Sequence, residues 1–292
     1  MKAPSAGHAA RYPSCLTPTR LLAALLVAGC ANPAPPAGMT PTPRGRRPAD
    51  DISLRPGWRA TVLVQREDSI ILTLPSGDRQ LQRFDRRAGF TLAIGGDGKV
   101  SLRLDSLTVH PGDTGESQAP LGATWSEHAS DVAVNAMRVT SGGDLAAALT
   151  AVVRNLLPRL PANGVHSLMT WADSASGNVR VDIFVASERR TASWSSGAVS
   201  GRGGSQVLPV RVCENFEQLG DGSQDGRKLS MTSQGRRSGT YYLTLDGRIS
   251  SAQLEDSVAM LISIPATRQV VPTTQYARTT VLFISATHDQ SD

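Results

Sequence analysis

The feature that most constrains the fold of this chain is a regular alternation of apolar and polar residues between short turns. In residues 99–107, Val100, Leu102 and Leu104 alternate with polar residues. A period of two places successive side chains on opposite faces of a β-strand. Comparable segments, separated by Gly, Asp or Pro residues, cover residues 58–64, 69–74, 79–84 and 89–94. The pattern predicts an antiparallel meander with one apolar face and one wet face.

A second series of such segments fills the other half of the chain. The pairs Asp221-Gly222, Asp225-Gly226 and Asp246-Gly247 lie between its members and are typical of hairpin turns. We therefore expect a mainly β protein with two related curved sheets or half-barrels, the second a weak internal repeat of the first. The segments are residues 166–171, 178–186, 190–194, 206–217, 228–233, 239–245, 249–254, 258–264 and 279–284.

One segment between the two series has the pattern of an amphipathic helix. In residues 144–157 apolar side chains recur at helical spacing, alanines favour the helical state, and Pro158 ends it. We expect this helix to pack on a sheet and to cover a packed core or a cavity for an acyl chain. The candidate ligand-binding residues on its apolar stripe are Leu145, Leu149, Val152, Val153 and Leu156.

The amino-terminal segment carries a different signal. Basic residues precede an apolar run at residues 21–29, and Val27-Ala28-Gly29-Cys30 resembles the lipobox of bacterial lipoproteins. The resemblance implies a cleaved signal peptide and acyl chains on Cys30, which anchor the protein in a membrane. A plain cleaved signal peptide is the alternative. A transmembrane helix is disfavoured, because nine residues span only about 14 Å of a hydrocarbon core about 30 Å thick.

These features divide the chain into five parts. Residues 1–29 are the predicted signal peptide, and residues 30–56 form a lipid-anchored, Pro-rich tether. Residues 57–140 form the first β-meander, residues 141–161 the amphipathic helix and its linker, and residues 162–288 the second β-meander. Because Ala31 follows the predicted lipidation site, we expect an outer-membrane location facing the periplasm.

Charge and cysteine content indicate whether a nucleic-acid partner or a disulfide is to be expected. Residues 30–292 hold 27 basic and 25 acidic side chains, and no basic run is interleaved with aromatic residues, so we expect no nucleic-acid partner. Of the three cysteines, Cys15 would leave with the signal peptide and Cys30 would carry lipid. Cys213 would then be alone, and we expect no intramolecular disulfide.

The sequence contains only weak candidates for metal-binding or catalytic motifs. His128 lies near acidic residues, but its neighbours alternate between faces and lack metal-ligand spacing. Residues 221–226 resemble half of a calcium loop, yet Thr232 stands where a glutamate is required, so a hairpin turn is favoured. Nucleophile motifs are missing from the sequence. We therefore expect no enzyme activity, no metal and no cofactor.

The order of lipobox, Pro-rich tether and β-meander with a covering helix resembles that of periplasmic half-barrel lipoproteins, among them the lipoprotein-carrier family. Residues 157–173 resemble a segment of secreted bacterial β-rich proteins, which implies no activity. Our first hypothesis is a non-enzymatic, lipid-anchored envelope protein that binds an apolar ligand or an envelope component. The second is a structural or assembly lipoprotein with a packed core and a protein partner, and the third is a secreted enzyme.

Overall fold

The structure is a computed structural model of the 292-residue chain. It describes residues 51–96, 100–110, 123–127, 137–139, 150–181 and 183–285. These residues belong to one compact unit, Pro48–Asp292. The predicted signal peptide, most of the tether and Cys30 lie outside the described residues.

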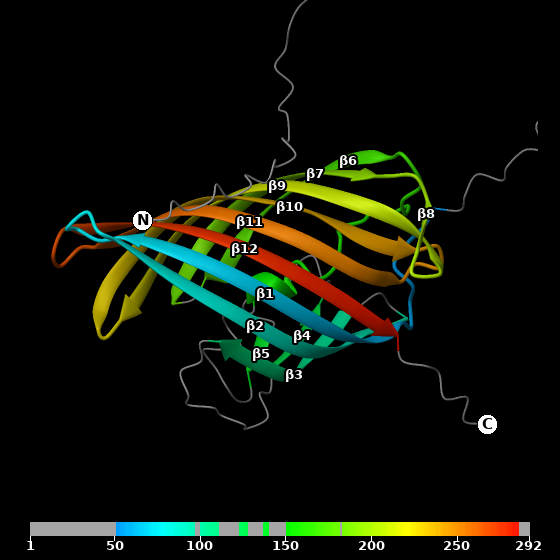
Figure 1. The fold of residues 1–292 in the computed structure, drawn as a ribbon, viewed down its shortest axis with the longest axis horizontal. Helices are drawn as coiled ribbons and strands as arrows, with labels where there is room; N and C mark the ends of the chain where they lie inside the picture. Colours follow the sequence, from blue (N-terminus) through cyan, green and yellow to red (C-terminus); the bar gives the residue numbers. More distant parts are fainter. Residues whose placement is uncertain are drawn as a thin grey trace, which may run out of the picture. The chain divides into compact units, whose positions relative to one another are not determined.

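All the strands of the described residues join in one antiparallel sheet of twelve strands (Figure 1). The expected two sheets are therefore not shown, because β1 pairs with both β2 and β12 and so joins the two halves of the chain. The order is β5-β4-β3-β2-β1-β12-β11-β10-β9-β7-β6, and β8 pairs with β9. The strands are β1 Arg59–Thr73, β2 Arg79–Ile94, β3 Val100–His110, β4 Ala123–Glu127, β5 Met137–Val139, β6 Thr170–Val181, β7 Phe184–Ser196, β8 Ser200–Arg202, β9 Ser205–Gln224, β10 Arg227–Thr244, β11 Ile249–Ile264 and β12 Gln269–Ser285.

Most strands are much longer than the segments predicted from the sequence. We expected two strands in residues 58–74, separated by turn residues Glu67 and Asp68, but β1 runs without a break. Strands β2, β10 and β11 likewise each span two predicted segments. The apparent breaks are polar positions inside the strands, and several of these polar side chains are buried.

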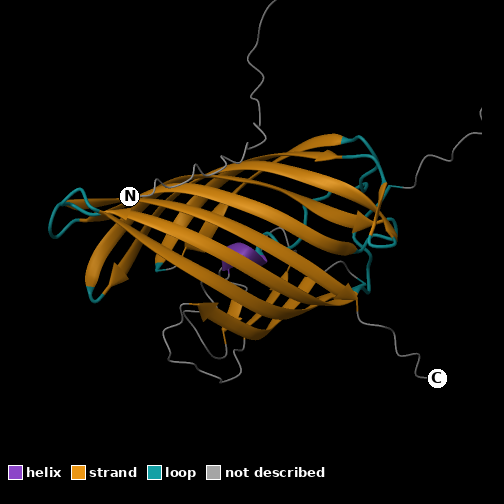
Figure 2. Ribbon diagram, viewed as in Figure 1, coloured by secondary structure: helices purple, strands orange, loops and turns teal. Residues whose placement is uncertain are grey.

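The two faces of the sheet differ in their surroundings. One face, here called the inner face, carries the buried side chains and curves around the helix α2 Thr150–Val153 (Figure 2). The large core cluster on this face combines strand residues such as Val62, Phe90 and Val281 with Val152 of α2 and Leu156, which follows it. A smaller cluster, which includes Phe184 and Met231, lies nearer the hairpin turns. The opposite, outer face is largely polar and exposed.

The helix expected over residues 144–157 is not shown. Residues 140–149 lie outside the described residues, and the described helix ends at Val153. Leu156 and Leu157 are buried as expected, but they lie in the turn that follows. After Val153 the segment continues as a turn, in which Asn155 N–H donates to the Val152 oxygen at 3.0 Å and Leu156 N–H donates to the Val153 oxygen at 3.2 Å.

The turns confirm two of the three Asp-Gly predictions. Asp225 and Gly226 both have positive φ and close the β9–β10 hairpin, as a two-residue turn of this kind requires. Asp246 and Gly247 form the turn between β10 and β11. The third prediction, Asp221-Gly222, is wrong, because both residues lie inside β9 and pair with β10. Side-chain space explains this glycine: a Cβ at Gly222 would lie 2.8 Å from the Ile183 carbonyl oxygen.

Candidate functional site

The inner face carries a belt of buried charged side chains between its two apolar clusters. The sheet register places Asp68 of β1 beside Ala277, then Asp256, Arg237 and Glu214 on the next three strands. Alternation puts all of these side chains on the same face. The four charged members are all buried. A charge taken out of water is costly unless it is paired, so the partners of each group matter.

Arg66 links two of these strands. Its Nε lies 3.1 Å from Asp68 Oδ1, and its Nη1 lies 3.0 Å from Asp256 Oδ2. Asp68 also pairs with Arg86 of β2 and accepts a 2.8 Å hydrogen bond from Gln275 of β12. Each carboxylate therefore meets more than one donor, which offsets its loss of hydration.

Arg237 is the centre of the belt. Its Nε donates to Asp256 Oδ1 at 2.7 Å, and its Nη1 donates to Glu214 Oε1 at 2.8 Å. The same Nη1 donates to the Asn155 side-chain oxygen at 2.7 Å, while the Tyr241 hydroxyl donates to the Asn155 backbone oxygen at 2.7 Å. The belt thus holds the segment that follows α2 against the sheet.

Two arginines of that segment make further ion pairs with the sheet. Arg154 Nη2 lies 2.6 Å from Glu188 Oε1 of β7, and Arg159 Nη1 lies 2.8 Å from Asp173 Oδ2 of β6. Trp171 donates its indole N–H to the Arg159 backbone oxygen at 3.0 Å and stacks on Trp194. We call residues 150–169, which cross the inner face in this way, the covering segment.

The protonation behaviour of the belt follows from these contacts. The two arginines Arg237 and Arg66 outweigh the effect of burial and lower the pKa of Asp256. Arg154 and a hydrogen bond from Gln218 likewise lower the pKa of Glu188. Burial raises the pKa of Glu214, because it outweighs the attraction of Arg237. Asp256 and Glu188 are therefore ionised partners of arginines at neutral pH.

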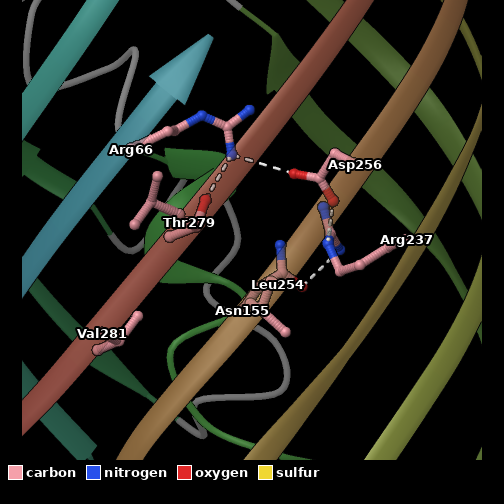
Figure 3. A pocket seen from close by; sticks show the side chains of 8 residues that line it. Arg66, Asn155, Arg237, Leu254, Asp256, Thr279 and Val281 are labelled. Atoms are coloured by element: carbon pink, nitrogen blue, oxygen red, sulfur yellow. Dashed lines mark hydrogen bonds and ion pairs between the residues drawn. The ribbon is translucent and has the colours of Figure 1, made fainter. Parts of the chain in front are cut away.

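A small cavity, of about 10 Å³, lies beneath the covering segment where it meets the belt (Figure 3). That volume is at the lower limit for a single water molecule and is far below that of a small-molecule site, about 300 Å³ or more. It is lined by Arg66, Val152, Asn155, Arg237, Leu254, Asp256, Thr279 and Val281.

The structure brings together only some of the predicted site residues. Val152, Val153 and Leu156 are buried in the core cluster, where they contact other side chains. Leu145, Leu149 and the lipidation candidate Cys30 lie outside the described residues, as does His128. The charged belt was not predicted from the sequence. Its only signal there is that charged residues stand at positions where the period-two pattern places inner-face side chains.

A second feature lies on the outer face, close to the hairpin turns. Leu219 of β9 pairs with Thr232 of β10, which pairs with Leu261 of β11, which pairs with Pro272 of β12. Leu219 is 63 % exposed and Leu261 is 49 % exposed. One row further from the turns, the pairs Leu81–Ile71 and Ile71–Thr274 extend the set across β2, β1 and β12. The outer-face apolar patch is defined as Ile71, Leu81, Leu219, Ala259, Leu261, Val270 and Pro272.

Cys213 lies on the outer face of β9. Cys15 and Cys30 lie outside the described residues, so the expectation of no intramolecular disulfide after loss of Cys15 and lipidation of Cys30 stays a prediction.

Comparisons with known proteins provide no further assignment. No protein-family model, curated protein or solved structure matches the chain. Within the described ranges, no three His, Cys, Asp or Glu side chains are grouped so that they would hold a metal ion. A search of the same residues for a helix of sufficient length and hydropathy to cross a membrane found none.

Proposed function

We propose that this chain is a non-enzymatic, lipid-anchored protein of the bacterial cell envelope that binds a protein partner through the outer-face apolar patch. The anchoring half of the proposal rests on the sequence Val27-Ala28-Gly29-Cys30 and on the Pro-rich tether that follows it. Acylation at Cys30 would hold the folded domain beside a membrane, and the Ala31 that follows favours the outer membrane. The binding half rests on the geometry of the sheet.

The packing of the covering segment against the sheet favours a protein partner over an apolar ligand beneath that segment. An acyl chain beneath the covering segment would have to displace Val152, Val153 and Leu156 from the core cluster. It would also separate Asn155 from Arg237, and Arg154 from Glu188. Leaving a buried charge without its partner costs about 3–5 kcal/mol. The ligand hypothesis at the covering segment is therefore the weaker one.

The observation that carries the proposal is two neighbouring rows of the outer face in which apolar side chains lie in cross-strand register, interrupted only by Thr232 and Thr274. Five strands contribute to the patch, and from β2 to β9 it extends over about 24 Å, at roughly 4.8 Å between neighbouring strands. The rows nearer the middle of the outer face are polar, with Gln65, Thr280 and Gln253 in one such row. A contiguous apolar patch beside a polar surface is typical of a protein–protein interface.

The charged turns beyond the patch favour a protein over a lipid surface. Arg227, Lys228 and Arg268 are exposed at the tips of the β9–β10 and β11–β12 hairpins. If the sheet end entered a bilayer, these charges would have to enter the hydrocarbon before the apolar band did, which is unfavourable. A protein partner packed on the outer face leaves the same charges in water.

Paired substitutions on the outer face test this proposal. In the lipidated protein extracted from its own membranes, Leu261→Ser should weaken binding of the co-purifying partner about tenfold or more, as expected for a leucine at the centre of an interface. Leu63→Ser is the matched control, since Leu63 is a similarly exposed leucine that pairs with Leu282 in a separate apolar group of the outer face, away from the patch. Equal partner binding by the two variants would refute the patch as the interface.

A further inference from the structure

We infer that strand β6 is a second, homotypic interface, at which the sheets of two copies of this chain join edge to edge. This inference goes beyond the proposed function, since it concerns a different surface and a different partner. In the described part of the chain, β6 ends the strand order and pairs only with β7. A strand with one unpaired edge offers a row of backbone N–H and C=O groups to an incoming strand.

The covering segment protects only the first half of this edge. Trp171 and Asp173 contact Arg159 of that segment. Beyond them, Ser174, Ser176 and Asn178 are exposed, and a Cβ added at Gly177 would meet nothing within 4 Å. Residues 174–179 therefore present small side chains and open space to an approaching strand.

The usual protection of an edge strand is missing from this stretch. Proteins guard long edges with Lys, Pro, bulges or very short strands. Strand β6 has twelve residues, contains no Lys or Pro, and pairs with β7 without a shift in register. At the other end of the strand order, β4 has five residues and β5 has three, which are much poorer templates.

The absence of charge in the stretch favours a second copy over a different partner. Two-fold pairing of antiparallel strands sets each residue against itself or a close neighbour, so a charged stretch would oppose like charges. Residues 174–179 carry no charge. With the two-fold axis at Ser176, the pairs would be Ser174 with Asn178, Ala175 with Gly177, and Ser176 with its own copy. Attachment to one membrane would raise the local concentration of the two copies and support a short interface.

Disulfide trapping tests the inference directly. The full chain is produced in its host with Cys213→Ser, so that the native thiol cannot react, and Ser176→Cys is added. Oxidation of the membranes should give a disulfide-linked dimer of twice the chain mass. Ser187→Cys is the matched control, because Ser187 is exposed on the same face but lies on β7, one strand in from the edge.

A second variant distinguishes a dimer formed by strand pairing from a disulfide formed when two chains collide by chance. Adding Ser174→Lys and Asn178→Lys to the Ser176→Cys chain places lysines opposite one another across the axis and should abolish the dimer. Three results would overturn the inference: a dimer yield equal to that of the Ser187→Cys control, a dimer that survives the two lysines, or a cross-link to a protein of different mass. None of these readouts depends on the outer-face apolar patch.

Discussion

Asp256 shows how a single buried charge organises this fold. It accepts hydrogen bonds from Arg66 of β1 and Arg237 of β10, so it ties together strands that are far apart in the sequence. Replacing both partners by apolar groups is often harmless in proteins, whereas removing one partner leaves an uncompensated charge. The stability of the belt is therefore best tested one residue at a time.

We predict that Asp256→Asn lowers the free energy of unfolding by about 3–5 kcal/mol at pH 7, because two buried arginines lose their shared carboxylate. The loss should depend on pH. The pKa of Asp256 is lowered below its ordinary value of 3.8, so its stabilisation is present above that pH and is lost as the pH falls through the lowered pKa. Denaturant unfolding of both proteins from pH 7 to pH 2 measures this, and the two curves should begin to approach one another below pH 3.8 and meet only below the lowered pKa of Asp256.

The control for that experiment is an ion pair on the surface. Arg103 and Asp105 lie 2.8 Å apart but are largely exposed. Asp105→Asn should change the free energy of unfolding by only about 0–1 kcal/mol at any pH in this range. A loss at Asp256 no larger than this would contradict a structural role for the belt.

At the scale of strands, glycines on the belt side of β10 allow close contact between neighbours. A Cβ at Gly239 would lie 2.3 Å from the Gln253 backbone oxygen, so Gly239→Ala must displace β11. We expect a loss of about 1–3 kcal/mol, as for other overpacked sites, measured by denaturant unfolding. Gly201→Ala in β8 is the control, since nothing lies within 4 Å of its Cβ. Equal effects of the two substitutions would show that β10 and β11 are not packed this closely.

The sequence predicted the strand positions well and the strand lengths poorly. Alternation located the apolar inner-face residues, as in β3, where Val100, Leu102 and Leu104 are buried. It failed at Glu67 and Asp68, because a carboxylate is common in turns and strand spacing does not show that Asp68 pairs with Arg66 of the same strand and Arg86 of β2. The pairing of β1 with β12 was equally invisible, since it joins residues more than two hundred positions apart.

In the covering segment, too, sequence spacing predicted which residues are buried but not where the element ends. Its helical spacing identified Val152, Val153 and Leu156 as buried, which the structure confirms. The end of the helix at Val153 depends on Arg154, Asn155 and Arg159, whose partners belong to the sheet. Sequence spacing alone contains no information about those partners.

At the scale of the whole domain, the burial of Val152, Val153 and Leu156 in the core cluster indicates that the domain needs the covering segment to fold. Val153→Asp should unfold the domain or destabilise it by several kcal/mol, because it buries a carboxylate without a partner. Val199→Asp is the control, since Val199 is 36 % exposed. Thermal melts with and without a lipid extract measure the effect. A folded Val153→Asp domain whose only change is the loss of a lipid-induced shift would favour a ligand cavity instead.

The chemistry of residue 30 links the folded domain to its proposed place in the cell. Acylation of Cys30 and removal of Cys15 would rule out a disulfide between Cys213 and another cysteine of the chain, since a sulfur that carries a lipid thioether forms no disulfide. The covalent state of residues 30 and 213 in the mature protein therefore tests the proposal.

The most direct measurement is the intact mass, with peptide mapping, of the protein extracted gently from its own membranes without reduction. The proposed function predicts a chain that begins at an acylated Cys30 and contains a free thiol at Cys213. A chain that begins at Met1, an unmodified residue 30, or a disulfide between Cys30 and Cys213 would contradict it.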